Sequence, residues 1–315
     1  MNFLPSKNQY VYAKKNDNIV TKQIEKVIRS HVNIVQEPGD IKFASFNHTV
    51  LCQTCLPYRN PGDAMTWESK QGKVSLAVQA NKIYNPATSG FDFVGLPYGA
   101  KSRLLLSYFN TEAIRTQSKM IRVEDTMTGF IKSMGLDTNG RNIEEVKNQL
   151  RRLATSIISL GYTEDGIRGV QVDVKIVKGF EIDFQKNDKQ RTLWPGYIQL
   201  SEDYFTSLVK HAIPLDSRAL RMLSNNALAL DIYAWLAQRL HRIPLGKPHF
   251  VPWINVKEQF GIGYERIDKF KEVFRKTIAL VLTQYPTAKF VEDKNKGWLL
   301  YTSPAPITKG LTTIA

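Results

Sequence analysis

The sequence predicts an α+β chain with two winged-helix domains in tandem, mainly helical with β-hairpin wings. One order of elements occurs twice: a long apolar helix, a short helix ending near a glycine, a long basic amphipathic helix and a charged hairpin. This order is typical of winged-helix units, so we predict two contacts with duplex DNA. The two copies cover residues 101–184 and 217–302. The predicted domains are an N-terminal segment (1–40), a first winged-helix domain with an N-terminal elaboration (41–213) and a second winged-helix DNA-binding domain (214–315).

The composition favours a polyanionic partner. The 315 residues include 43 Lys and Arg against 29 Asp and Glu, for a formal net charge of +14. Such an excess attracts phosphate, although an acidic membrane surface or plain solubility would suit the same charge. The N-terminus lacks a signal-peptide pattern, no apolar run is as long as a membrane span, and two cysteines are too few for a disulfide framework. We therefore expect a soluble cytoplasmic protein.

Elements ahead of the first unit are only partly readable. Residues 1–17 are polar and are expected to be frayed. Apolar residues at helical spacing predict a helix over 19–36, which stops at the breaker pair Pro38-Gly39. Alternation of apolar and polar residues predicts a strand over 74–78, and residues 91–94 form a second short candidate.

The first unit is predicted from helical spacing followed by alternation. Apolar spacing indicates a helix over 103–116, and a short helix over 127–134 closes at Gly135. Asn142 is the expected cap of a long helix that continues to Gly161. A hairpin is expected over 170–184, with its turn at Lys178 and Gly179.

The second unit repeats this order after a strand, a helix and a proline-marked boundary at 214–216. Its predicted elements, with the two that precede it, are a strand over 197–200, a helix over 201–210, a helix over 217–241, a short helix over 254–260, a long helix over 264–285 and a hairpin over 289–302.

Each long helix has one apolar face and one face of cationic and amide side chains, which is the division that a helix in the major groove needs. Any surface helix has a solvated charged face, but both of these are third in matching units and precede a hairpin with lysines. The negative charges of Glu144 and Glu145 weaken the case for the first long helix as the main DNA-reading helix, so we expect the second long helix to make most base contacts. The predicted DNA-binding residues are Lys147, Asn148, Arg151, Arg152, Lys178, Arg266, Lys269, Lys271, Arg275, Lys276, Lys294 and Lys296.

The segment from Gly95 to Ser102 is close to a P-loop, whose pattern is G-x-x-x-x-G-K-[ST]. Ala100 stands where the second glycine is required, and Pro97 removes one N–H from the phosphate cradle. No alternation of helices and parallel strands surrounds the segment. We therefore predict a tight turn into a helix, and a nucleotide-dependent enzyme using Lys101 is the alternative.

His48, Cys52 and Cys55 have the residue types and spacing of zinc ligands, with His31 as a potential fourth. The sequence has no second cysteine pair, and apolar neighbours such as Val50 favour buried structural thiols. No motif of a hydrolase or metal-dependent nuclease occurs. We expect no catalytic activity, no metal and no cofactor.

Several segments carry a family resemblance. Leu-Pro-Tyr-Arg-Asn-Pro over 56–61, Leu-Pro-Tyr-Gly over 96–99 and Gln-Leu-Arg-Arg-Leu over 149–153 resemble the RepA family of plasmid replication initiators. Glu112 to Thr116 and the run over 200–205 are also similar to it. The second and third segments are fairly specific together and weak singly, and the resemblance covers about residues 47–303.

The resemblance implies a sequence-specific binder of repeated sites (iterons) at a plasmid origin. Such initiators open nearby duplex with the host initiator protein, recruit the replicative helicase, and in many cases switch between a repressing homodimer and an initiating monomer. Only Arg151 and Arg152 carry over from a matching motif, since the second long helix is assigned from its geometry alone. A winged-helix transcription repressor without a replication role is the alternative.

Overall fold

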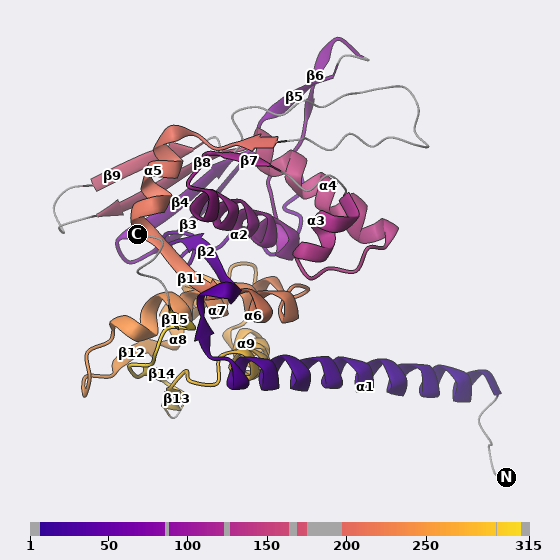
Figure 1. Ribbon diagram of the computed structural model, residues 1–315, viewed down its shortest axis with the longest axis vertical. Coiled ribbons are helices and arrows are strands. Elements are labelled where there is room, and N and C mark those ends of the chain that lie inside the picture. Colours follow the sequence, from indigo (N-terminus) through magenta and orange to yellow (C-terminus); the bar gives the residue numbers. More distant parts are fainter. Residues whose placement is uncertain are drawn as a thin grey trace.

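The computed structural model combines helices and strands and describes residues 7–85, 88–122, 127–163, 169–174, 197–293 and 295–309 (Figure 1). No helix in these ranges is long and apolar enough to cross a membrane. The helices are α1 (Lys7–Gln36), α2 (Gly99–Thr116), α3 (Met127–Ser133), α4 (Gly140–Thr155), α5 (Glu202–His211), α6 (Ser217–Met222), α7 (Ala227–Arg239), α8 (Trp253–Phe260) and α9 (Ile267–Gln284). The strands are β1 (Gly39–Asp40), β2 (Ala44–His48), β3 (Thr66–Gln71), β4 (Val74–Gln79), β5 (Lys82–Asn85), β6 (Gly90–Phe93), β7 (Met120–Arg122), β8 (Ile157–Thr163), β9 (Gly169–Val174), β10 (Tyr197–Gln199), β11 (Ala212–Asp216), β12 (His249–Pro252), β13 (Phe290–Asp293), β14 (Gly297–Leu300) and β15 (Ile307–Lys309).

The part of the chain predicted as the first domain contains a four-stranded antiparallel sheet with the order β3-β4-β8-β9. Its register places Leu76 of β4 opposite Leu160 of β8, and Val78 opposite Ile158. All four side chains are buried and belong to the same hydrophobic core as Leu105 of α2. Strand β4 is the strand predicted from alternation, which thus gives the sheet its apolar face.

Helix α4 is shorter than predicted. Its cap is Asn139, whose side chain accepts the Asn142 N–H at 2.8 Å, and the helix ends at Thr155. The residues predicted as its last turn form β8 instead. Ile157 and Ile158 pair with β4, and β-branched residues such as these fit a sheet better than a helix. The hairpin therefore consists of β8 and β9, one strand earlier than predicted. Residues 175–196, with Lys178 and the predicted return strand, lie outside the described residues.

The single helix predicted over 217–241 is wrong, because two helices occupy that range. Helix α6 ends at Met222, and Asn226 begins α7 by accepting the Ala229 N–H with its side chain at 3.0 Å. Such an N-cap satisfies a donor that a continuous helix would bond internally. Helices α8 and α9 follow β12, and the hairpin β13–β14 pairs with it in the order β12-β14-β13.

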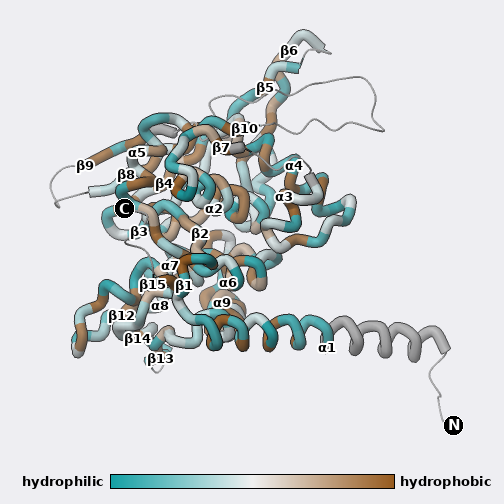
Figure 2. The backbone as a smooth tube through the Cα atoms, viewed as in Figure 1, coloured by the Kyte–Doolittle hydropathy of each residue, from teal (hydrophilic) through white to brown (hydrophobic). Residues whose placement is uncertain are grey.

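The two units share one core. Helix α7 of the second unit contacts α2 of the first unit as well as α9, and it buries residues on all its sides, from Leu228 to Gln238. In Figure 2 hydrophobic segments occur on α2, β4 and α7. Strand β11 pairs with β2 of the N-terminal region through Leu215 and Ser45, so it extends across the predicted boundary at 213/214. That division into domains stays a prediction.

Helix α1 begins at Lys7 rather than near Ile19, because no glycine or proline interrupts the chain between Lys7 and Gln36. Figure 1 shows that it extends far from the rest of the molecule. Its C-terminal end is held by Arg218, which donates to the carbonyls of Asn33 at 2.8 Å and Glu37 at 2.9 Å.

Candidate nucleic-acid interface

Helix α9 is braced against its hairpin by Arg275. The guanidinium donates to both carboxylate oxygens of Glu292 on β13, at 2.9 and 2.7 Å, and to Asn295 Oδ1 at 2.7 Å. Hydrogen bonding from Arg275 lowers the pKa of Glu292, so this carboxylate stays charged. The side chains are 39% and 23% exposed, and such a pair contributes only about 0.2–1 kcal/mol. Its main consequence is therefore geometric: it fixes the angle between helix and hairpin.

Trp253 of α8 supports the same brace. Its indole Nε1 donates to Glu292 at 3.0 Å, and Arg275 lies over its ring at 5.4 Å. Lys271 also lies over this ring, at 5.3 Å, and donates to the Asn295 carbonyl at 3.2 Å. Of the five predicted contacts on α9, Lys271 and Arg275 are thus engaged with the hairpin.

The other three predicted cations of α9 lie at its surface. Arg266 is 70% exposed and pairs with Asp268, while Lys269 (64%) and Lys276 (75%) share Glu272. Exposed pairs of this kind are weak and salt-screened, so phosphate can replace the carboxylate at little cost.

The hairpin tip combines a turn residue with lysines. Asn295 adopts the left-handed region with φ of 65°, which asparagine tolerates better than most residues. Lys296 follows it and is exposed, whereas Lys294 lies outside the described residues. The tip therefore exposes at least one cation.

The predicted face of α4 is less uniformly cationic. Lys147 pairs with Glu144 at 3.1 Å and its side chain is only 17% exposed. Arg151 is exposed, and its guanidinium forms no hydrogen bond or ion pair within the described part of the chain. Asn148 is exposed and accepts from Arg152 Nε at 3.0 Å. Among the described residues, Arg151 is thus the only cation on this face without a protein partner.

The two most specific family motifs bind each other. Arg152 donates to the Leu96 carbonyl at 3.0 Å and lies 5.2 Å from the Tyr98 ring centroid. Gln149 is buried, and its Oε1 accepts the Tyr98 N–H at 2.9 Å. A side chain on Gly95 would collide with the Arg152 guanidinium. Gln149 and Arg152 therefore hold α4 against the turn that leads into α2.

The near P-loop is that turn. Ser102 Oγ lies 2.6 Å from the Tyr98 carbonyl and 2.8 Å from Gln149 Oε1. Lys101 Nζ lies 3.3 Å from Asn225 Oδ1 and 3.5 Å from a carboxylate oxygen of Glu145. The two side chains that a P-loop would direct at phosphate and magnesium are thus bound to protein groups, which favours a turn into a helix.

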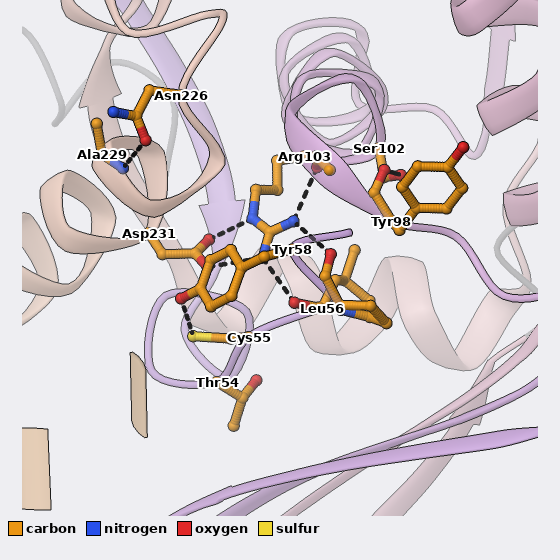
Figure 3. Close-up of polar contacts among 12 residues, drawn as sticks. Thr54, Cys55, Leu56, Tyr58, Tyr98, Ser102, Arg103, Asn226, Ala229 and Asp231 are labelled. Atoms are coloured by element: carbon orange, nitrogen blue, oxygen red, sulfur yellow. Dashed lines mark hydrogen bonds and ion pairs between the residues drawn. The ribbon is translucent and has the colours of Figure 1, made fainter. Parts of the chain in front are cut away.

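A buried ion pair joins the two units at this point (Figure 3). Arg103 of α2 donates to both oxygens of Asp231 on α7, at 2.6 and 2.7 Å, and to the Leu56 carbonyl at 2.8 Å. The guanidinium also lies 4.9 Å from the Tyr58 ring centroid, so the 56–61 motif packs here too. This pair was not among the predicted sites, although a single aspartate in the apolar run Leu228–Leu236 was the signal for it.

The residues with zinc-ligand spacing are buried, and the ring nitrogens of His48 contact protein groups. His48 Nε2 lies 3.0 Å from Ser207 Oγ, and its Nδ1 accepts the Val50 N–H at 3.2 Å. Burial lowers the pKa of His48 to about 3, whereas burial raises the pKa of the free thiols of Cys52 and Cys55. Within the described ranges no three His, Cys, Asp or Glu side chains are placed to hold a metal ion.

The fold defines a class of mixed helix-and-strand protein with known structural counterparts. A crystal structure of domain 2 and domain 3 of RctB is similar with a TM-score of 0.50 and 8% identity, covering 81% of this chain and 96% of that one. A second structure, of RctB domains 2–3, gives a TM-score of 0.48 at 9% identity over 80% of this chain and 94% of that one. At this identity the first similarity concerns the fold alone.

A comparison of the sequence with models of protein families shows which family the chain belongs to. Residues 96–252 match the model of the plasmid-encoded RepA protein family, and no curated protein matches the chain. The chain belongs to this family through that segment, so the predicted resemblance is confirmed. The matched segment begins at the turn into α2 and ends with β12.

Proposed function

We propose that the protein is a plasmid replication initiator that binds iterons at its origin through two winged-helix units. On this proposal it then promotes origin opening and helicase loading. Its role is to bind DNA and partner proteins rather than to catalyse a reaction. Membership of the RepA family supports a role in plasmid replication. Recognition of repeated sites by both units is our inference from the arrangement of their helices.

The observation that carries the proposal is the second unit. Its order is α7, β12, α8, α9 and a hairpin, with the hairpin strands paired to β12 as β12-β14-β13. This is the order of a winged helix in which α9 would enter the major groove and the hairpin would contact phosphate. The brace from Arg275 to Glu292 would hold both elements at the angle that simultaneous contact requires.

The first unit has the same order with one departure. Strand β7, which follows α2, pairs with β10 rather than with the hairpin β8–β9. Its third helix α4 offers Arg151 as a free cation. We therefore assign most base contacts to α9, and to α4 a second contact in a neighbouring groove.

The partners that we propose are those that the resemblance to RepA initiators implies. A host initiator protein would assist duplex opening, and the replicative helicase would be loaded on the opened strands. A homodimer would be the repressing form and a monomer the initiating form. Such a protein would act in the cytoplasm, where plasmid DNA is replicated.

Plasmid maintenance tests the function directly. The gene would be deleted from a plasmid carrying the origin, and the protein would be supplied in trans. Recovery of replicating plasmid supports an initiator, whereas failure with intact repression of the gene would favour a transcription repressor. The double variant Arg266→Ala/Lys276→Ala should abolish maintenance, while the matched surface variant Lys73→Ala should retain it. Equal maintenance by both variants would reject the role of α9.

A further inference from the structure

Two grooves in the surface meet between the proposed reading helices. The α9 groove has a volume of about 780 Å³ and lies beside the N-terminal half of α9, where Arg266 and Lys269 line it. The α4 groove, of about 580 Å³, is lined by Arg141 and Asn148 of α4. Asn225, an exposed residue between α6 and α7, lines both. The grooves thus adjoin at Asn225. We call the two grooves together the path, which α9 borders at one end and α4 at the other.

The middle of this path carries donors without protein acceptors. Arg59 from the 56–61 motif lines the α9 groove, is exposed, and forms no hydrogen bond or ion pair within the described residues. Asn225 uses its Oδ1 to accept from Lys101 Nζ at 3.3 Å, which leaves its Nδ2 donors free within that same part of the chain. Both groups suit an anionic oxygen.

The charges that line the α9 groove also favour an anion. Arg59, Arg266 and Lys269 line the α9 groove against the one carboxylate of Glu265. In the α4 groove two cations face two carboxylates, and the remaining polar lining is mostly amide: Asn139, Asn142, Asn148, Gln149 and Asn225. Tyr58, Trp67 and Val273 give the lining of the α9 groove an apolar part, against which the sugars of a strand would pack.

We propose that Arg59 and Asn225 contact the phosphodiester backbone of duplex DNA between the two reading helices. This inference rests on the proposed function and adds to it a site outside both long helices. Such contacts carry no base information, so they fix the register of the two units on the DNA and strengthen binding to any sequence. They would link the two major-groove contacts into one continuous footprint.

The salt dependence of binding tests this site. Wild type, Arg59→Ala, Arg59→Lys and the matched control Lys73→Ala would be titrated with a duplex cut from beside the gene and with a scrambled duplex of equal length. Each phosphate contact contributes about 0.9 to the slope of log K against log salt. We expect Arg59→Ala to reduce the slope by about 0.9 on both duplexes, Arg59→Lys to retain it, and Lys73→Ala to match wild type.

A second variant tests Asn225 without removing its bond to Lys101. Asn225→Asp keeps an acceptor for Lys101 but places a negative charge where the backbone would lie, so it should weaken binding to both duplexes. Wild-type slopes for Arg59→Ala together with unchanged affinity for Asn225→Asp would overturn the proposal. The proposed function itself fails on a different result, namely a wild type that binds the two duplexes equally. A loss confined to the native duplex would also overturn the backbone assignment, because it would indicate base reading.

Discussion

The ion pair between Arg103 and Asp231 is predicted to be the main polar link between the two units. Both side chains are nearly inaccessible, at 8% and 9% exposed, and the carboxylate accepts two short hydrogen bonds. Arg103 also donates to the carbonyls of Leu56 and Gly99, at 2.8 Å each. Removal of either partner leaves the other charge buried without its counter-charge.

The magnitudes follow from what each variant leaves behind. Breaking a buried pair costs roughly 3–5 kcal/mol. Asp231→Leu should cost about 3 kcal/mol, because Arg103 keeps its carbonyl acceptors, and Arg103→Met about 4 kcal/mol, because those carbonyls also lose their donor. The double variant should cost no more than Arg103→Met, about 4 kcal/mol, since it leaves the same carbonyls without a donor but buries no charge, which gives a coupling energy of at least about 3 kcal/mol.

Urea denaturation of the four proteins measures this cycle, with the free energy of unfolding taken from each transition. The matched control is Arg115→Met, because Arg115 lies on the same helix with a 71% exposed side chain and should cost little. Additive costs, with the double variant losing about 7 kcal/mol, would refute the reasoning that the two charges stabilise each other.

Three further predictions concern other parts of the molecule. Arg152→Ala should lower Tm by about 2–4 °C, whereas Arg151→Ala should leave Tm unchanged and weaken DNA binding; the reverse pattern would contradict their assigned roles. Glu292→Gln should weaken binding to the native duplex in an affinity titration, because Arg275 loses its ionic partner on the hairpin. Stronger binding would contradict this and would indicate that Glu292 holds Arg275 back from contacting a base. The pKa of His48 is about 3 in the fold and 6.5 unfolded, so the unfolded state binds the extra proton and stability falls as pH falls below 6.5. In His48→Gln the free energy of unfolding should fall less steeply between pH 6.5 and 5, by up to about 1.4 kcal/mol per pH unit. A fall as steep as that of wild type, measured by urea denaturation, would contradict this prediction.

Helical and alternating spacing predicted most elements of the second unit, because local periodicity determines which residues can face a core. The end of α4 and the division of 217–241 were wrong for one reason. Ile157 and Leu160 follow helical spacing, but pairing with β4 decides their structure. In the same way, the cap made by Asn226 outweighs a long apolar run.

The candidate site divides along similar lines. Charge and spacing identified the exposed cations of α9, since these depend on local sequence alone. They did not separate Arg151, which is free, from Arg152, which binds the Leu96 carbonyl 56 positions away. Arg275 likewise has a brace that depends on the hairpin. Contacts between distant segments assign such residues, and no pattern within one helix encodes them.

The most direct test of origin recognition is binding to DNA cut from beside the gene against scrambled DNA at two salt concentrations. We predict a preference for the native duplex of about 10³ or more that persists while both affinities fall steeply with salt. Arg266→Ala/Lys276→Ala should remove the preference while leaving weak, salt-sensitive binding. Equal binding of both duplexes by the wild-type protein, lost together as salt rises, would contradict the account and leave only its basic surface explained.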